Sequence, residues 1–164
     1  MAEIVTDLKL ANLSLSNVNV EPAPSVMSSN ITVASASATH GDYSSRLLVV
    51  PQTVGTDGRL YTLENPTATG LTYRFMYAGT SAASAVQDIV IQTYTTAHTM
   101  KGVVSHLSTD SGISAAVADD NASNRLTINT CAAMDLTLTS NSTTNWVVSG
   151  SVSSANAPAF DARS

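Results

Sequence analysis

One alternating segment, Gly70-Leu-Thr-Tyr-Arg-Phe-Met-Tyr, directs this chain towards β structure more strongly than any other feature. Every second position in it is apolar or aromatic: Leu71, Tyr73, Phe75 and Tyr77. Successive side chains of a β-strand point to opposite faces, so a period of two indicates a strand with one buried face. The segment therefore predicts a half-buried strand over 71–78.

Other strand candidates follow at short intervals, at 31–35, 46–50, 59–63, 88–95, 101–107, 125–130, 134–139 and 145–152. Turn-forming sequences separate them, such as Glu64-Asn-Pro and Asp119-Asp-Asn. The Ala-rich stretch 81–88 is too short for a stable isolated helix, and we expect a loop with one turn there. Region 108–124 is expected to be a long loop. The pattern predicts an all-β fold, an antiparallel β-sandwich with a jelly-roll-like arrangement, in residues 31–164.

Residues 1–30 are predicted to form an extended N-terminal arm ahead of the sandwich. Glu21-Pro-Ala-Pro interrupts backbone hydrogen bonding at its end. Apolar side chains in such a segment have no reason to remain in water, so they are the predicted interface with other subunits. These candidate interface residues are Leu8, Leu10, Leu13, Leu15, Val18 and Val20. The alternative is that the last four belong to the first core strands.

Charge and hydropathy exclude two classes of partner. The net charge is −5, and the seven Lys and Arg residues are scattered, so we expect no nucleic-acid partner. The densest apolar run, Leu47-Leu-Val-Val, is far shorter than a membrane span, so we expect no membrane partner. The N-terminal sequence lacks the basic and apolar regions of a signal peptide, which predicts synthesis in the cytoplasm.

No residue pattern predicts catalysis, a metal or a cofactor. His40, His98 and His106 have no paired ligand spacing, and we expect them to make ordinary hydrogen bonds. Asp119-Asp-Asn, with Asp110 nearby, could offer oxygens to calcium but lacks the spacing of a recognisable site. The single cysteine, Cys131, is expected to be a small buried residue. An enzyme is the least supported class.

The aromatic side chains allow two interpretations. They could form a sugar-stacking platform, but in a chain with only 5% aromatic residues they are needed to fill a core between two sheets. We therefore expect Trp146, the only tryptophan, to pack against the Tyr73 and Phe75 face.

Three segments in order carry a resemblance: Asp57-Gly-Arg-Leu-Tyr-Thr-Leu, the alternating strand from Gly70, and Thr144-Asn-Trp-Val-Val-Ser-Gly-Ser-Val. Over residues 57–155 the chain resembles capsid decoration (cement) proteins and related virion structural β-sandwich proteins of tailed bacteriophages. The resemblance implies a non-enzymatic virion protein, synthesised in the host cytoplasm, that binds the major capsid protein on the outer capsid surface and cements adjacent capsomers, often as a homotrimer. The alternative is a receptor- or glycan-binding module of a phage tail fibre or head.

Overall fold

The computed structural model describes residues 25–26, 31–33, 43, 45–50, 59–78, 88–108, 112–119 and 121–163. These residues contain strands and connections but no helix. The strands are β1 (Ser25–Val26), β2 (Ile31–Val33), β3 (Leu47–Val49), β4 (Arg59–Leu63), β5 (Thr72–Ala78), β6 (Ile89–Thr93), β7 (Thr99–Ser108), β8 (Gly112–Asp119), β9 (Arg125–Ile128), β10 (Cys131–Ser140), β11 (Asn145–Ser154) and β12 (Ala159–Asp161).

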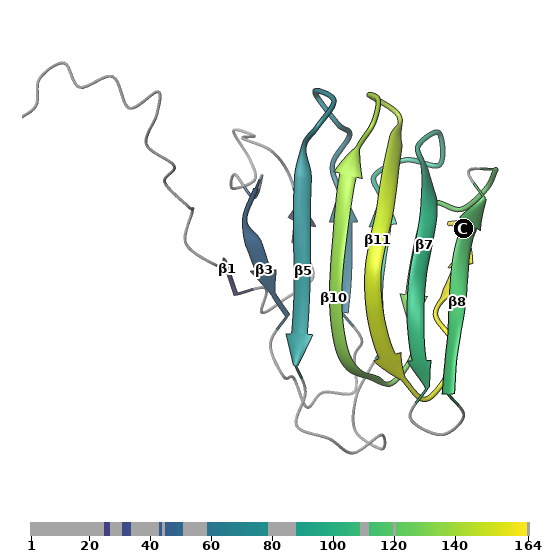
Figure 1. Ribbon diagram of the computed structural model, residues 1–164. Helices are drawn as coiled ribbons and strands as arrows, with labels where there is room; N and C mark the ends of the chain where they lie inside the picture. Colours follow the sequence, from purple (N-terminus) through teal and green to yellow (C-terminus); the bar gives the residue numbers. More distant parts are fainter. Residues whose placement is uncertain are drawn as a thin grey trace, which may run out of the picture.

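Two sheets pack face to face and form a β-sandwich. The larger sheet has the strand order β1-β3-β5-β10-β11-β7-β8, and the smaller has the order β12-β9-β6-β4-β2. In Figure 1 the larger sheet faces the viewer, with β1 at its left edge and β8 at its right edge. The predicted all-β sandwich is confirmed.

The sheets are mixed rather than antiparallel throughout, because the first half of the chain winds between them. Strands β1, β3 and β5 are parallel neighbours in the larger sheet, and β2, β4 and β6 are parallel neighbours in the smaller one. The chain crosses to the opposite sheet after each of these strands. When it comes back to the first sheet, the new strand runs in the same direction as the previous strand of that sheet, so the two are parallel. Short alternating strands do not reveal this winding, which is why the sequence indicated hairpins.

The second half of the chain closes the sandwich largely with antiparallel pairs. Hairpins join β7 to β8 and β10 to β11, and β10 also pairs antiparallel with β5. Strand β11 runs parallel to β7, with Val148 opposite Gly102. The backbones of neighbouring strands lie close together at two glycines. A Cβ atom on Gly102 of β7 would lie 2.0 Å from the carbonyl oxygen of Val148 on β11, and one on Gly150 of β11 would lie 2.1 Å from that of Asp135 on β10. Only glycine fits at these two positions.

Aromatic and aliphatic side chains fill the space between the sheets. The Tyr73 and Trp146 rings lie with centroids 5.3 Å apart, and those of Tyr61 and Phe75 lie 5.5 Å apart. Tyr73, Phe75 and Tyr77 are buried while Thr72, Arg74 and Met76 are not, which confirms the alternation predicted for this strand. Cys131 is buried and free, as expected.

Three strands lie where none was predicted, and one of them is β1, within the expected arm. Strand β8 occupies 112–119, inside the region expected to be a long loop, and β12 follows at 159–161. The larger apolar residues of β8, Ile113 and Val117, point away from the core, and only the small Ala116 and Ala118 are buried. The segment therefore shows little of the buried face that sequence patterning detects.

The arm lies mostly outside the described residues. Of residues 1–30, Ser25 and Val26 form β1, the edge strand beside β3. The helix candidate also lies outside, apart from Asp88. The six candidate interface residues lie outside the described residues as well: Leu8, Leu10, Leu13, Leu15, Val18 and Val20.

Candidate functional site

The β7–β8 hairpin carries an apolar stripe on the outer face of the larger sheet. Val103 lies opposite Val117 and Leu107 lies opposite Ile113 in the register of the two strands. Their exposed fractions are 51%, 63%, 44% and 82%, respectively. Paired strands place opposite side chains on the same face, so the four form one surface, called here the edge stripe. Exposed apolar residues gathered in this way are typical of interaction sites.

Strand β8 is also the edge of its sheet. Among the described residues it pairs with β7 alone, so its other side presents unpaired backbone groups. Natural edge strands are commonly protected by lysine, proline or inward-pointing charges. From Gly112 to Ala118 the strand has none of these, and its one charge, Asp119, comes at its end opposite Lys101. The strand is thus open to pairing with another strand.

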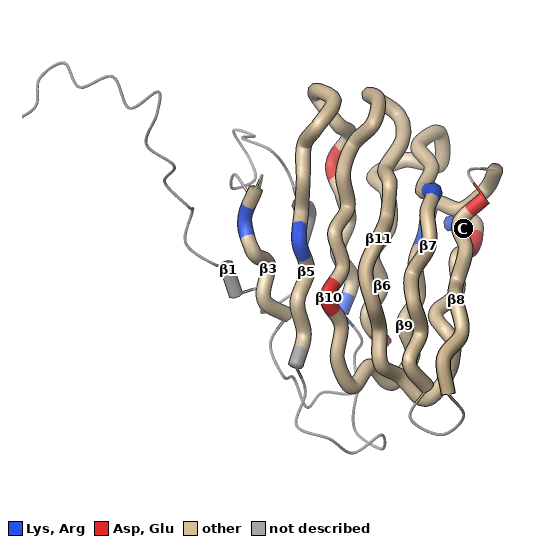
Figure 2. Tube along the Cα trace, viewed as in Figure 1, with Lys and Arg blue, Asp and Glu red and all other residues tan. Residues whose placement is uncertain are grey.

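The rest of this outer face is small and hydroxyl-rich. Five of the outward positions on β10 and β11 carry a hydroxyl group: Thr137, Thr139, Ser149, Ser151 and Ser153. Figure 2 shows β7, β8, β10 and β11 without charge over most of their length. Arg74 and Asp135 form a bidentate pair, with Nε–Oδ1 and Nη2–Oδ2 distances of 2.8 and 2.6 Å, and this pairing lowers the pKa of Asp135. Such a face can approach another protein with little desolvation of charge.

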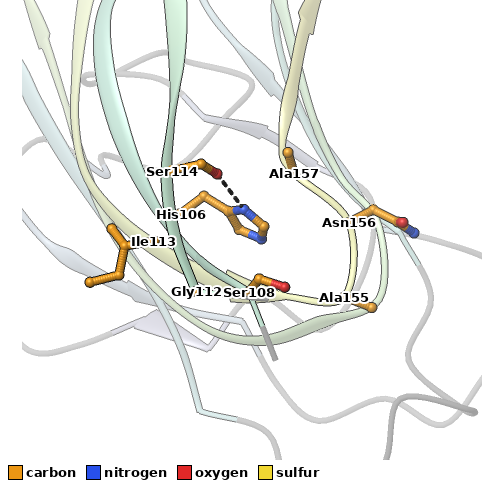
Figure 3. Close-up of a pocket in the computed structure, with 8 residues that line it drawn as sticks. All are labelled: His106, Ser108, Gly112, Ile113, Ser114, Ala155, Asn156 and Ala157. Atoms are coloured by element: carbon orange, nitrogen blue, oxygen red, sulfur yellow. Dashed lines mark hydrogen bonds between the residues drawn. The ribbon is translucent and has the colours of Figure 1, made fainter. Parts of the chain in front are cut away.

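On the inner side of β8 the surface is hollowed. The hollow has a volume of about 220 Å³ and is lined by His106, Ser108, Gly112, Ile113, Ser114, Ala155, Asn156 and Ala157. Figure 3 shows that β7 and β8 form one wall and that the chain after β11 forms the other. Successive side chains of β8 point to opposite faces, so Ser114 faces the hollow, whereas the side chain of Ile113, which also borders the hollow, belongs to the edge stripe.

His106 is fixed in this hollow by two hydrogen bonds. Its Nε2 lies 3.0 Å from the carbonyl oxygen of Ser154, and its Nδ1 lies 3.0 Å from Oγ of Ser114. A carbonyl oxygen only accepts, so Nε2 donates, and in the neutral imidazole Nδ1 accepts from the Ser114 hydroxyl. Both ring nitrogens are therefore engaged, and the pair stiffens the wall of the hollow.

The other predicted polar positions do not join this site. His98 is buried, with Nδ1 2.6 Å from Oγ1 of Thr95, and His40 lies outside the described residues. Oδ1 of Asp119 accepts hydrogen bonds from the backbone N–H of Asn121 and the hydroxyl of Ser123, which lower the pKa of Asp119. These contacts close a turn.

Within the described ranges, no three His, Cys, Asp or Glu side chains gather in a metal-binding geometry. Asp110 and Asp120, the other acidic members of the calcium candidate, lie outside those ranges.

The predicted aromatic cluster belongs to the core. All five side chains are buried: Tyr61, Tyr73, Phe75, Tyr77 and Trp146. They are therefore not available as a sugar-stacking platform. The sequence contains one signal for the edge stripe, the alternation of Ile113, Ala115 and Val117, which lies within the region predicted to be a loop.

The chain was compared with known protein families, curated proteins and solved structures, and it matches none of them. In the described part of the chain, no helix is long and apolar enough to cross a membrane.

Proposed function

We propose that this chain is a non-enzymatic virion structural protein that binds the outer surface of a tailed-phage capsid and cements adjacent capsomers. The observation that carries the proposal is the edge stripe on β7 and β8, where β8 has one side without a partner among the described strands, on a sheet face with few charges. A cementing protein needs extended surfaces that fit other protein surfaces, and this face provides one without a titrating centre.

The segment-by-segment resemblance to capsid decoration proteins supports the same function. It implies the major capsid protein as partner and a homotrimer as the assembled form. The proposed attachment also uses the apolar residues of the arm, from Leu8 to Val20, since they are the candidate interface residues in the N-terminal sequence.

The test uses undecorated heads assembled from the major capsid protein of the same genome. The full chain is expected to cosediment with expanded heads, to saturate at a fixed ratio to capsomers, and to raise the temperature at which the heads fall apart. A variant with Asp at Leu8 and Leu10 should bind less, while Thr127→Asp, on the smaller sheet, should bind like the parent chain.

Failure to bind heads under any of these conditions would overturn the proposal. Retention of the chain on a glycan array, combined with no binding to heads, would instead support a receptor- or glycan-binding module. The burial of the five core aromatics argues against that outcome.

A further inference from the structure

The edge of the larger sheet has the features of an acceptor for one additional strand. Within the described part of the chain, strand β8 pairs with β7 alone and presents the backbone groups of its other side. Its outward face carries Ile113 and Val117, and its inner face carries Ser114 beside the hollow. An added strand gains affinity from main-chain hydrogen bonds and specificity from sites for its alternate side chains.

The two faces of β8 define the sequence that would fit. Because an added strand continues the alternation of its neighbour, side chains on its outer face would lie beside the edge stripe and should be apolar. Side chains on its inner face would lie beside the hollow. There Ser114 and His106 already hydrogen bond to each other, so small hydroxyl groups suit the space better than large or charged ones.

The arm contains this pattern once without interruption, at Leu13-Ser-Leu-Ser. Leu13 and Leu15 would lie beside the stripe, and Ser14 and Ser16 would lie on the side of the hollow. The other arm segment with two leucines at this spacing, Leu8-Lys-Leu, would instead place a lysine on the inner side.

Chain length argues against pairing of this segment with its own β8. The arm leads into β1, and β3, β5, β10, β11 and β7 lie between β1 and β8. A strand added beyond β8 would be seven strand spacings from β1, about 34 Å in a straight line. From Ser16 to Ser25 a fully extended chain spans at most about 32 Å, and its path must also pass around the sheet.

We propose that the Leu13-Ser-Leu-Ser segment of one copy adds as a strand to β8 of a second copy. This inference rests on the proposed function in so far as the arm is an attachment device. The contact is heterologous, since the donor surface and the acceptor surface differ, and such contacts form a ring when the rotation closes. Three copies in a ring would satisfy every arm and every β8 edge, in agreement with the homotrimer proposed above.

The test measures the oligomeric state of full-length variants by light scattering. Each variant is measured alone and in a mixture with the other. Leu13→Asp/Leu15→Asp removes the donor and keeps the acceptor. Ile113→Asp removes the acceptor and keeps the donor, and folding is spared because Ile113 is 82% exposed. Thr127→Asp on the smaller sheet is the matched control. Thermal melts verify that each variant is folded.

The parent chain and the control are expected to be trimers, and each interface variant alone a monomer. A mixture of the donor and acceptor variants should give a 1:1 dimer, because only one productive contact remains. A monomeric parent chain at millimolar concentration would overturn the inference. Self-association of the Leu13→Asp/Leu15→Asp variant would overturn it too, and would indicate direct pairing of two β8 edges. If the oligomeric states differ from those expected while the chain still binds heads, the proposed function stands without this contact.

Discussion

The Trp146 ring lies against the Tyr73 ring between the two sheets, with centroids 5.3 Å apart and planes inclined by 38°. Both side chains are almost completely buried, and they come from β11 and β5, which flank β10 in the larger sheet. The contact thus joins the winding half of the chain to the half that closes the sandwich.

Trp146→Ala is expected to lower the free energy of unfolding by about 3–5 kcal/mol, because it removes a large buried ring. The indole Nε1 of Trp146 is buried without a hydrogen-bond partner among the described residues. Burying such a group unsatisfied costs about 1–3 kcal/mol, so Trp146→Phe should lose much less stability than Trp146→Ala. Chemical denaturation measures both. Equal losses for the two variants would contradict this account of the indole.

Gly102→Ala and Gly150→Ala should each destabilise the protein severely or prevent folding. The new methyl group would overlap the backbone of the neighbouring strand, and the backbone φ angles of +130° and +131° disfavour any other residue. Gly70→Ala is the matched control, since Gly70 also has a positive φ, +88°, but no atom lies within 4 Å of the added Cβ. If Gly70→Ala cost as much stability as the other two, backbone conformation rather than overlap would be the cause.

The thiol of Cys131 should be inert in the folded protein. Burial raises its pKa from 9.0 to about 12, so a thiol reagent at pH 8 should modify the unfolded chain and spare the native one. Rapid labelling under native conditions would show that the thiol is accessible.

Ionisation of Cys131 should also make stability depend on alkaline pH. Above pH 9 the unfolded chain releases the thiol proton while the folded chain retains it, so stability falls as the pH rises towards 12. Tyr61, with its pKa raised from 10.0 to about 12 by burial, adds to the loss only above pH 10. Urea denaturation at pH 9 and 10 should therefore show a smaller loss in Cys131→Ala than in the parent chain.

The Arg74–Asp135 pair should contribute little to stability despite its short contacts. Both side chains are about half exposed, and exposed ion pairs contribute little because water and salt screen them. Its contribution is present above the usual carboxyl pKa and is lost as the pH falls through the lowered pKa of Asp135. Asp135→Asn should therefore shift the melting temperature slightly at neutral pH and less in high salt. A large salt-independent loss would mean that Asp135 has another structural role.

The buried elements of this fold were predictable from sequence because burial leaves a period of two. The alternation at Tyr73, Phe75 and Tyr77 placed a strand and its inner face correctly, and it led to the Trp146 contact. The parallel winding was not predictable, since a strand has the same alternation whether its neighbour runs parallel or antiparallel.

The candidate site was missed for the opposite reason. Ile113 and Val117 alternate as strand residues do, but the inner positions of β8 are Ser114, Ala116 and Ala118, which are too small to suggest a core. An edge strand whose larger side chains face outward has neither the apolar inner face of a buried strand nor the polar composition of an exposed loop. Its position became clear only from its pairing with β7.

The winding of the first half has a mechanical consequence. The first strands of this winding, β1 and β2, are the edge strands of the two sheets on the side of the arm. They are two and three residues long. Tension transmitted through the arm would first load these short strands, and it could peel them away while the ten-residue strands β7, β10 and β11 stay paired. These short edge strands would then extend while the rest of the sandwich stays folded, so a protein held by its arm would lengthen at one edge before its core came apart.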